Sequence, residues 1–159
     1  MSCPRPAVAL LAALTALTAL TLTGCAATVS MQPADDADDP LCAAVMVRLP
    51  DSLDGQQRRW TDAQSTGAWG APSAVLLSCG VVPPGPTEAQ CITVAGVDWI
   101  VDDSDAPRYR ITSYGRTPAV EVLTDNEIVA PTSVLDGLAT AVQQLPKERQ
   151  CTSTSSVLP

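Results

Sequence analysis

The 159-residue sequence contains no histidine and no phenylalanine, and Lys147 is its only lysine. Without His, the usual general base for a Ser or Cys nucleophile is missing. Without Phe, the core has to be built mainly from Val, Leu, Ile and Ala. The spacings HExxH and CxxC and the phosphate-binding loop are also missing. We therefore expect a protein that is not an enzyme and that holds no cofactor and no metal ion.

Positive charge is scarce as well, with nine basic residues against 17 acidic ones. Only Arg5 among the basic residues precedes Cys25, so a chain that begins at Cys25 has eight basic residues, 17 acidic residues and a net charge of −9. A charge of this sign repels nucleic acids and anionic lipid headgroups. No nucleic-acid partner is expected.

The first 24 residues have the pattern of a bacterial lipoprotein signal peptide. Arg5 and the amino terminus supply a short positive region, and residues 7–22 are an uncharged stretch of Ala, Leu, Val and Thr. As a helix this stretch would span about 24 Å, which is less than the roughly 30 Å core of a bilayer. The segment Leu22-Thr23-Gly24-Cys25 then resembles the lipobox, in which the Cys thiol is alkylated.

The lipobox predicts cleavage before Cys25 and at least a diacylglyceryl group on its sulfur. Two acyl chains anchor a protein stably, whereas one does not. We therefore expect the protein at the outer face of the cytoplasmic membrane, to which the lipid on Cys25 anchors it. The alternative is an ordinary secretory cleavage site followed by an incidental Cys.

The chain divides into four predicted segments: a signal peptide (1–24), an acidic flexible tether (25–39), a single domain (40–151) and a disordered tail (152–159). The tether has little apolar periodicity and carries a run of Asp residues between positions 35 and 39. This run lacks the alternating Asp or Asn and the Gly of a calcium-binding loop. A flexible stretch of this length would reach roughly 20 Å.

Local patterns predict a helix at each end of the domain, with short strands between. Asp39 and Pro40 fit the N-cap and the first position of a helix that ends near residue 49, and apolar periodicity predicts a second helix at 131–145. Strands are predicted at 73–79, 91–94, 97–101, 108–113 and 119–124, with turns at 95–96 and 102–107. No structure is predicted for 52–67. The sum is a two-layer α+β fold, in which an antiparallel sheet of four or five strands carries helices on one face.

Setting aside Cys3 in the signal peptide and the lipidated Cys25 leaves four cysteines, Cys42, Cys79, Cys91 and Cys151. An even number of Cys outside the cytoplasm indicates two disulfides, and four Cys allow three pairings. Cys79 and Cys91 would lie at the facing ends of neighbouring strands, so we expect them to pair. The second bond would then join Cys42 to Cys151.

Several short motifs along the domain resemble a known family. They are Ala-Trp-Gly-Ala-Pro at 68–72, Cys-Gly at 79–80, Cys91, Gly-Val-Asp-Trp at 96–99, Tyr-Gly-Arg at 114–116 and Val-Glu-Val at 120–122. In this order they are similar to lipoproteins of high-GC Gram-positive bacteria that share domain of unknown function 3515, over about residues 41–145. The resemblance implies a location and a fold, but it brings no known activity and no catalytic residues.

We expect a lipid-anchored cell-envelope protein, a binding or accessory module whose partner is an envelope protein or a cell-wall component. Aromatic and basic side chains could form the contact surface for such a partner. The candidates are Trp60, Trp69, Tyr114, Arg58, Arg59 and Arg116. The alternative for Trp69, and for Trp99, is a place in the core, because no Phe is present to fill it.

The alternative function is a carboxylate-based hydrolase that acts on cell-wall material. Its candidates are Asp98, Glu121 and Asp102, since the acid and the nucleophile of such enzymes lie about 5–10 Å apart. Asp98 precedes Trp99, and neighbouring residues on a strand point to opposite faces of the sheet. We therefore expect Asp98 and Glu121 to face solvent and to form salt bridges with Arg110 or Arg116 instead of a catalytic pair.

Overall fold

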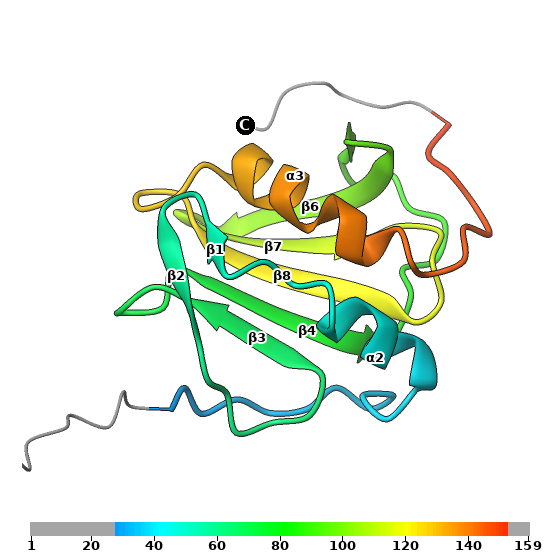
Figure 1. Cartoon of the computed structure of the whole chain (residues 1–159). Helices are drawn as coiled ribbons and strands as arrows, with labels where there is room; N and C mark the ends of the chain where they lie inside the picture. Colours follow the sequence, from blue (N-terminus) through cyan, green and yellow to red (C-terminus); the bar gives the residue numbers. More distant parts are fainter. Residues whose placement is uncertain (1–27, 153–159) are drawn as a thin grey trace, which may run out of the picture.

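The computed structural model describes residues 28–152. The predicted signal peptide, the lipidation site Cys25 and residues 153–159 of the predicted tail lie outside the described residues. Within the described part, the chain forms one eight-stranded antiparallel sheet with two helices on one of its faces (Figure 1). An antiparallel sheet with helices is what the sequence predicts, but the expected number of four or five strands is wrong.

The strands follow the order β1-β2-β3-β4-β8-β7-β6-β5 across the sheet. Their bounds are Ser52–Leu53 (β1), Gln56–Arg59 (β2), Thr66–Trp69 (β3), Val75–Val81 (β4), Cys91–Val94 (β5), Val97–Asp105 (β6), Arg108–Ser113 (β7) and Ala119–Asp125 (β8). β5 and β7 have the predicted bounds. β6 continues to Asp105, so the turn expected at 102–107 is restricted to the two residues between β6 and β7.

The helices are α2, Pro40–Met46, and α3, Pro131–Val142. Both begin where the sequence predicts, and the Asp39 side chain caps α2 by accepting a hydrogen bond from the Leu41 amide (2.7 Å). α3 lies across the sheet in contact with β1, β5 and β8, while α2 contacts β4 and α3. Neither of these two helices has the length or the apolar content to cross a bilayer, and the described residues contain no other candidate span.

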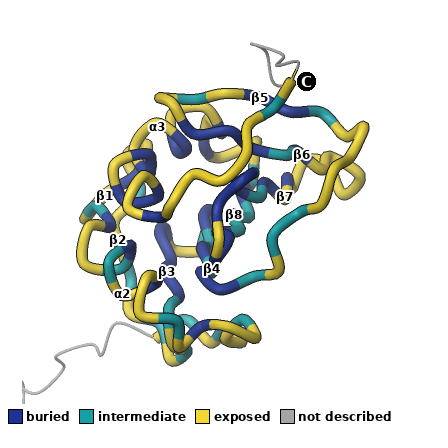
Figure 2. Tube along the Cα trace, turned by 90° about the vertical axis from the view of Figure 1, so that its right-hand side faces the viewer, coloured by how far each residue is buried: buried dark blue, intermediate teal, exposed yellow. Residues whose placement is uncertain are grey.

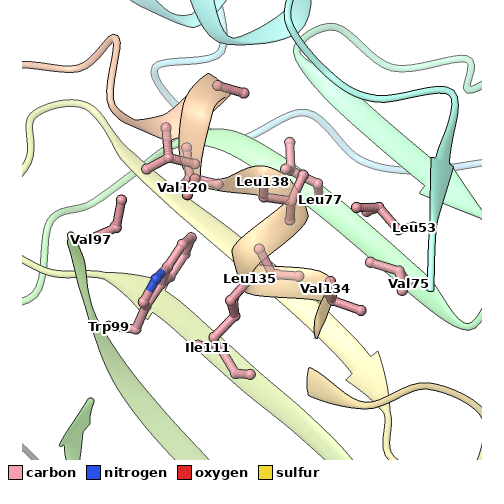
Figure 3. Packing of buried hydrophobic residues seen from close by; sticks show 14 of the residues in the cluster. Leu53, Val75, Leu77, Val97, Trp99, Ile111, Val120, Val134, Leu135 and Leu138 are labelled. Carbon is pink, nitrogen blue, oxygen red and sulfur yellow. The ribbon is translucent and has the colours of Figure 1, made fainter. Parts of the chain in front are cut away.

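The core lies between the helices and one face of the sheet (Figures 2 and 3). On that face, Leu77, Val122 and Ile111 stand in register on β4, β8 and β7, and all three are fully buried. Leu135 and Leu138 of α3 pack into the same cluster. Burying a side chain of this size contributes about 1.5–3 kcal/mol. Apolar contact between α3 and the sheet is therefore a main source of stability.

The strands that the sequence does not predict are β1, β2 and β3. β2 reads Gln-Gln-Arg-Arg and lies near the edge of the sheet, where polar side chains can reach solvent from both faces. β3 is fully buried and contains Gly67, at which a Cβ would lie 2.9 Å from the ring of Trp69. The lack of a side chain at Gly67 lets the Trp69 ring pack along its own strand. Neither pattern shows the alternation by which strands are predicted.

Trp69 and Trp99 are both fully buried, which confirms the core alternative for these two residues. Trp69 Nε1 donates a hydrogen bond to the Pro50 carbonyl (3.0 Å). Trp99 Nε1 is buried and finds no acceptor among the described residues. The two indoles therefore differ in one hydrogen bond while they share the same degree of burial.

Replacing Trp69 with Phe is expected to lower the free energy of unfolding by about 1–2 kcal/mol more than replacing Trp99 with Phe. Both changes remove a similar volume, but only Trp69→Phe leaves the Pro50 carbonyl without its donor, and an unpaired group inside a protein costs about 1–3 kcal/mol. Urea unfolding of the two variants measures this difference. A loss for Trp99→Phe that equals or exceeds the loss for Trp69→Phe would contradict the prediction.

The two disulfides join Cys42 to Cys79 and Cys91 to Cys151. The predicted pairs Cys79–Cys91 and Cys42–Cys151 are therefore wrong. The cause is the strand order, because β8, β7 and β6 lie between β4, which carries Cys79, and β5, which carries Cys91. Cys79 instead faces the helix side of the sheet and bonds to α2, while Cys91 on the edge strand holds the C-terminal segment.

The acidic stretch before α2 packs against the domain. The Asp36 amide donates to the Gly80 carbonyl (3.1 Å), and the Ser65 hydroxyl donates to the carbonyl of Ala37, which is buried. Gly80 has a φ of +97°, and a Cβ there would collide with the backbone of Asp36. The prediction of a flexible tether is therefore wrong for residues 29–39, which are fixed by backbone contacts.

Candidate functional site

Among residues 28–152, Trp60 is the only exposed Trp, with a relative exposure of 81 %. It follows β2 directly and lines a groove of about 600 Å³ between the end of α2 and the β2–β3 connection. We call this the Trp60 groove, lined by Met46, Asp51, Arg58, Arg59, Trp60, Thr61, Ala63, Ser65 and Thr66. An exposed indole at a groove is a typical anchor for a binding partner.

Backbone carbonyls hold the two Arg side chains of the Trp60 groove. Arg58 Nη1 donates to the Leu49 carbonyl (3.3 Å), and Arg59 Nη1 donates to the Gly70 carbonyl (3.0 Å). A guanidinium has five N–H donors in a planar fork and suits phosphate and carboxylate groups. Both Arg residues and Trp60 line the groove, which therefore combines an exposed indole with two Arg side chains that are hydrogen-bonded to backbone carbonyls.

Two threonine hydroxyls fix the connection between β2 and β3. The Thr66 hydroxyl lies 2.9 Å from the Thr61 hydroxyl and 2.7 Å from the Ala63 carbonyl. The Thr61 hydroxyl lies 3.3 Å from the Thr66 carbonyl. These hydrogen bonds join the two ends of the β2–β3 connection and fix its conformation, so they also restrain the backbone of Trp60 at its start.

The other three members of the predicted patch lie elsewhere. Trp69 is in the core, and Tyr114 and Arg116 follow β7, which is four positions away from β2 in the strand order. Arg116 is buried, with 5 % exposure, and donates a hydrogen bond to the Leu145 carbonyl. The prediction of one surface patch is therefore wrong for Trp69, Tyr114 and Arg116, whereas Trp60 shares its groove with two of the predicted Arg residues.

The sequence does not single out Met46 or Asp51 as members of this site. Both belong to the Trp60 groove because α2 ends, and β1 begins, beside the β2–β3 connection. The signal that would have found them is the β1–β2 hairpin, whose Asp54-Gly55 turn has positive φ values at both residues. Without β1 and β2, no argument places Asp51 next to Trp60.

Arg116 and Asp98 hold the C-terminal segment against the sheet. Gly115 accepts hydrogen bonds from the amides of Glu148 and Arg149, and the Asp98 carboxylate accepts one from the Cys151 amide (3.1 Å). Burial lowers the pKa of the Arg116 guanidinium from its usual value, and the Asp98 carboxylate nearby opposes this effect. These contacts make a structural clamp at the opposite side of the sheet from β2.

The prediction that Asp98 faces solvent is wrong, because the C-terminal segment covers its side chain. Its exposed fraction is 5 %, and its carboxylate accepts a hydrogen bond from the Thr93 hydroxyl (2.7 Å) and lies 3.9 Å from Lys147 Nζ. Glu121, by contrast, forms the predicted salt bridge with Arg110 (2.9 Å). Asp98 and Trp99 point to opposite faces of β6, as predicted.

Asp98 and Glu121 lie on β6 and β8, with β7 between these two strands. Glu121 on β8 is in register with Thr112 on β7 and, through it, with Ile100 on β6, two residues away from Asp98. Two strand spacings and two residues of rise put their Cα atoms about 12 Å apart. The observation against a carboxylate pair is that each carboxylate is already bound to a different partner, Asp98 to the Cys151 amide and Glu121 to Arg110.

A second groove of about 470 Å³ lies at the end of β6, β7 and β8 and contains Asp102. Arg108 stands in register between Asp105 and Asp125, so the charges of this groove alternate. Hydrogen bonds from the Ser104 side chain and backbone lower the pKa of Asp102. A lowered pKa keeps Asp102 ionised, so Asp102 does not suit the role of the acid in a carboxylate pair.

No group of three or more Cys, Asp or Glu side chains in residues 28–152 is arranged to hold a metal ion.

A comparison with protein-family models matches residues 5–150 to the family described as protein of unknown function DUF3515. No curated protein and no solved structure matches the chain. The match spans nearly the whole sequence and includes every motif on which the resemblance depends. The chain belongs to the DUF3515 family of proteins of unknown function.

Proposed function

We propose that this protein is exported, is anchored by a lipid on Cys25 at the outer face of the cytoplasmic membrane, and acts there as a binding or accessory module of the cell envelope. The observation that carries the location is the segment Leu22-Thr23-Gly24-Cys25 directly after an uncharged stretch. The four remaining cysteines form two disulfides, and disulfides persist in oxidising compartments outside the cytoplasm.

The observation that carries the binding role is the Trp60 groove. It combines an indole that is 81 % exposed with two Arg side chains fixed by backbone carbonyls. Aromatic and Arg side chains dominate the energetics of many interfaces. The hydrolase alternative has weaker support, because Asp98, Glu121 and Asp102 are engaged separately in the clamp, in a salt bridge and in a local turn.

Cys25→Ser is expected to move the protein from the membrane fraction to the soluble fraction. The reason is that the acyl chains would be lost, and a chain with net negative charge has no other strong attraction to a bilayer. Fractionation of a native-like host after a salt wash measures the change. Cys3→Ser is the matched control and should leave the protein in the membrane fraction, because Cys3 lies outside the lipobox. A Cys25→Ser protein that still sediments with membranes would overturn the proposed anchor.

A further inference from the structure

The chain enters the domain beside Trp60. Val29 forms a parallel bridge with Thr61, and its amide donates to the Trp60 carbonyl (2.8 Å). The Met31 amide donates to the Asp62 carboxylate (2.8 Å). In Figure 1 the first described residues, in blue, run along the connection between β2 and β3. The segment that leads back to Cys25 therefore starts at the same edge of the molecule as the Trp60 groove.

The Asp62 contact persists at neutral pH. Hydrogen bonds from the Met31 amide and then from the Ser30 hydroxyl lower the pKa of Asp62 from its usual value. Because the pKa of Asp62 is lower in the folded state, its ionised carboxylate stabilises the fold above the unfolded pKa of about 3.9. This stabilisation is lost only as the pH falls through the pKa of the folded state.

The chain between Cys25 and this edge is short. Residues 26–28 separate Cys25 from Val29, and four Cα–Cα steps reach at most about 14 Å. The headgroup layer on one side of a bilayer takes up about 5–7 Å of this length. A lipid on Cys25 would therefore hold the Trp60 edge within about 10 Å of the headgroups, so the domain cannot stand away from the membrane.

The side chains at this edge fit a phospholipid headgroup layer. Trp is enriched at membrane interfaces, where its ring sits at the level of the headgroups. Arg58 and Arg59 can bind phosphate oxygens, and the carboxylates of Asp51 and Asp62 can attract the positively charged ammonium groups of zwitterionic lipids. Mixed charge around one exposed indole matches a zwitterionic layer better than an anionic one, which the net charge of the chain would repel.

We propose that the Trp60 edge docks on the zwitterionic phospholipid headgroups of the membrane that carries the Cys25 anchor, with the Trp60 indole in the interface. This inference rests on the lipid anchor of the proposed function. It names the partner of the Trp60 groove and gives the domain one orientation on the membrane, in which the β2–β3 connection faces the lipid.

The test uses the lipidated mature protein in phosphatidylcholine vesicles whose acyl chains carry bromine, which quenches nearby tryptophan. Trp60 is expected to be quenched, and the total Trp emission should fall by about a third, the share of one Trp in three, because Trp69 and Trp99 are shielded in the core. Trp60→Phe should abolish this loss. Sedimentation of the same vesicles reports separately whether the anchor holds the protein.

The matched control moves the indole to another surface. In the double variant Trp60→Phe/Thr140→Trp, the new indole lies on the exposed side of α3 and should not be quenched by the lipid. Protein that fails to sediment would overturn the proposed anchor. Protein that sediments with an unquenched Trp60 would overturn the docking alone. Protection of that Trp60 from iodide would then indicate contact with a second copy of the protein. Equal quenching of Trp60 and of the indole at position 140 would also overturn the orientation.

Discussion

Replacing Cys42 and Cys79 together with Ala is expected to lower the free energy of unfolding by about 4 kcal/mol. The disulfide joins residues with a sequence separation of 37, and the loop-closure entropy that it removes from the unfolded chain predicts a loss of this size. Both residues are fully buried, so Ala also leaves unfilled volume between α2 and β4. Equilibrium unfolding in guanidinium chloride, without reductant, measures the effect.

A count of free thiols checks the pairing on which this prediction depends. In protein that begins at residue 26, Cys42→Ala/Cys79→Ala should have no free thiol, because Cys91 and Cys151 remain bonded. The control Cys79→Ala/Cys91→Ala should have two free thiols, since it removes one partner from each bond. The free thiols are counted in unfolded, unreduced protein. Two free thiols in Cys42→Ala/Cys79→Ala and none in Cys79→Ala/Cys91→Ala would instead support the pairing that the sequence predicts.

The pairing was not predictable because strand order is not a local property. Alternation within the chain locates β4 to β8 well, since each pattern depends on residues close together in sequence. The chain leaves β4 at Val81 and forms β5 from Cys91, yet β5 is the far edge of the sheet and β8 is the neighbour of β4. The assumption that consecutive strands pair therefore fails at the Pro-rich connection between them.

The candidate site was predictable only in part, for a similar reason. Trp60, Arg58 and Arg59 are adjacent in sequence, and they stay together on the surface. Trp69 is only nine positions from Trp60, but β3 lies inside the sheet and turns its indole into the core. The acidic stretch at 35–39 resembles a tether because its side chains are polar, whereas backbone hydrogen bonds, which side-chain patterns do not report, hold it.

Asp98→Ala is expected to lower the free energy of unfolding by about 3 kcal/mol. The change leaves the Thr93 hydroxyl and the Cys151 amide without an acceptor, and it removes the negative charge near the buried guanidinium of Arg116. Removal of one partner from a buried charge pair typically costs about 3–5 kcal/mol. Lys147 is half-exposed, so water can replace its contact, and the expected loss lies at the lower end of this range.

Glu121→Ala is the matched control, because Glu121 is the other carboxylate that the hydrolase alternative needs. Its salt bridge with Arg110 is solvent-exposed on the Arg side, and such pairs contribute at most about 1 kcal/mol. Asp98→Asn should fall between the two, since the amide keeps one acceptor oxygen for the two donors. A structural clamp requires this order of stabilities, measured by urea unfolding. If Asp98→Ala leaves stability unchanged while a cellular phenotype of the protein is lost, Asp98 acts on a substrate, and the hydrolase alternative displaces the binding role.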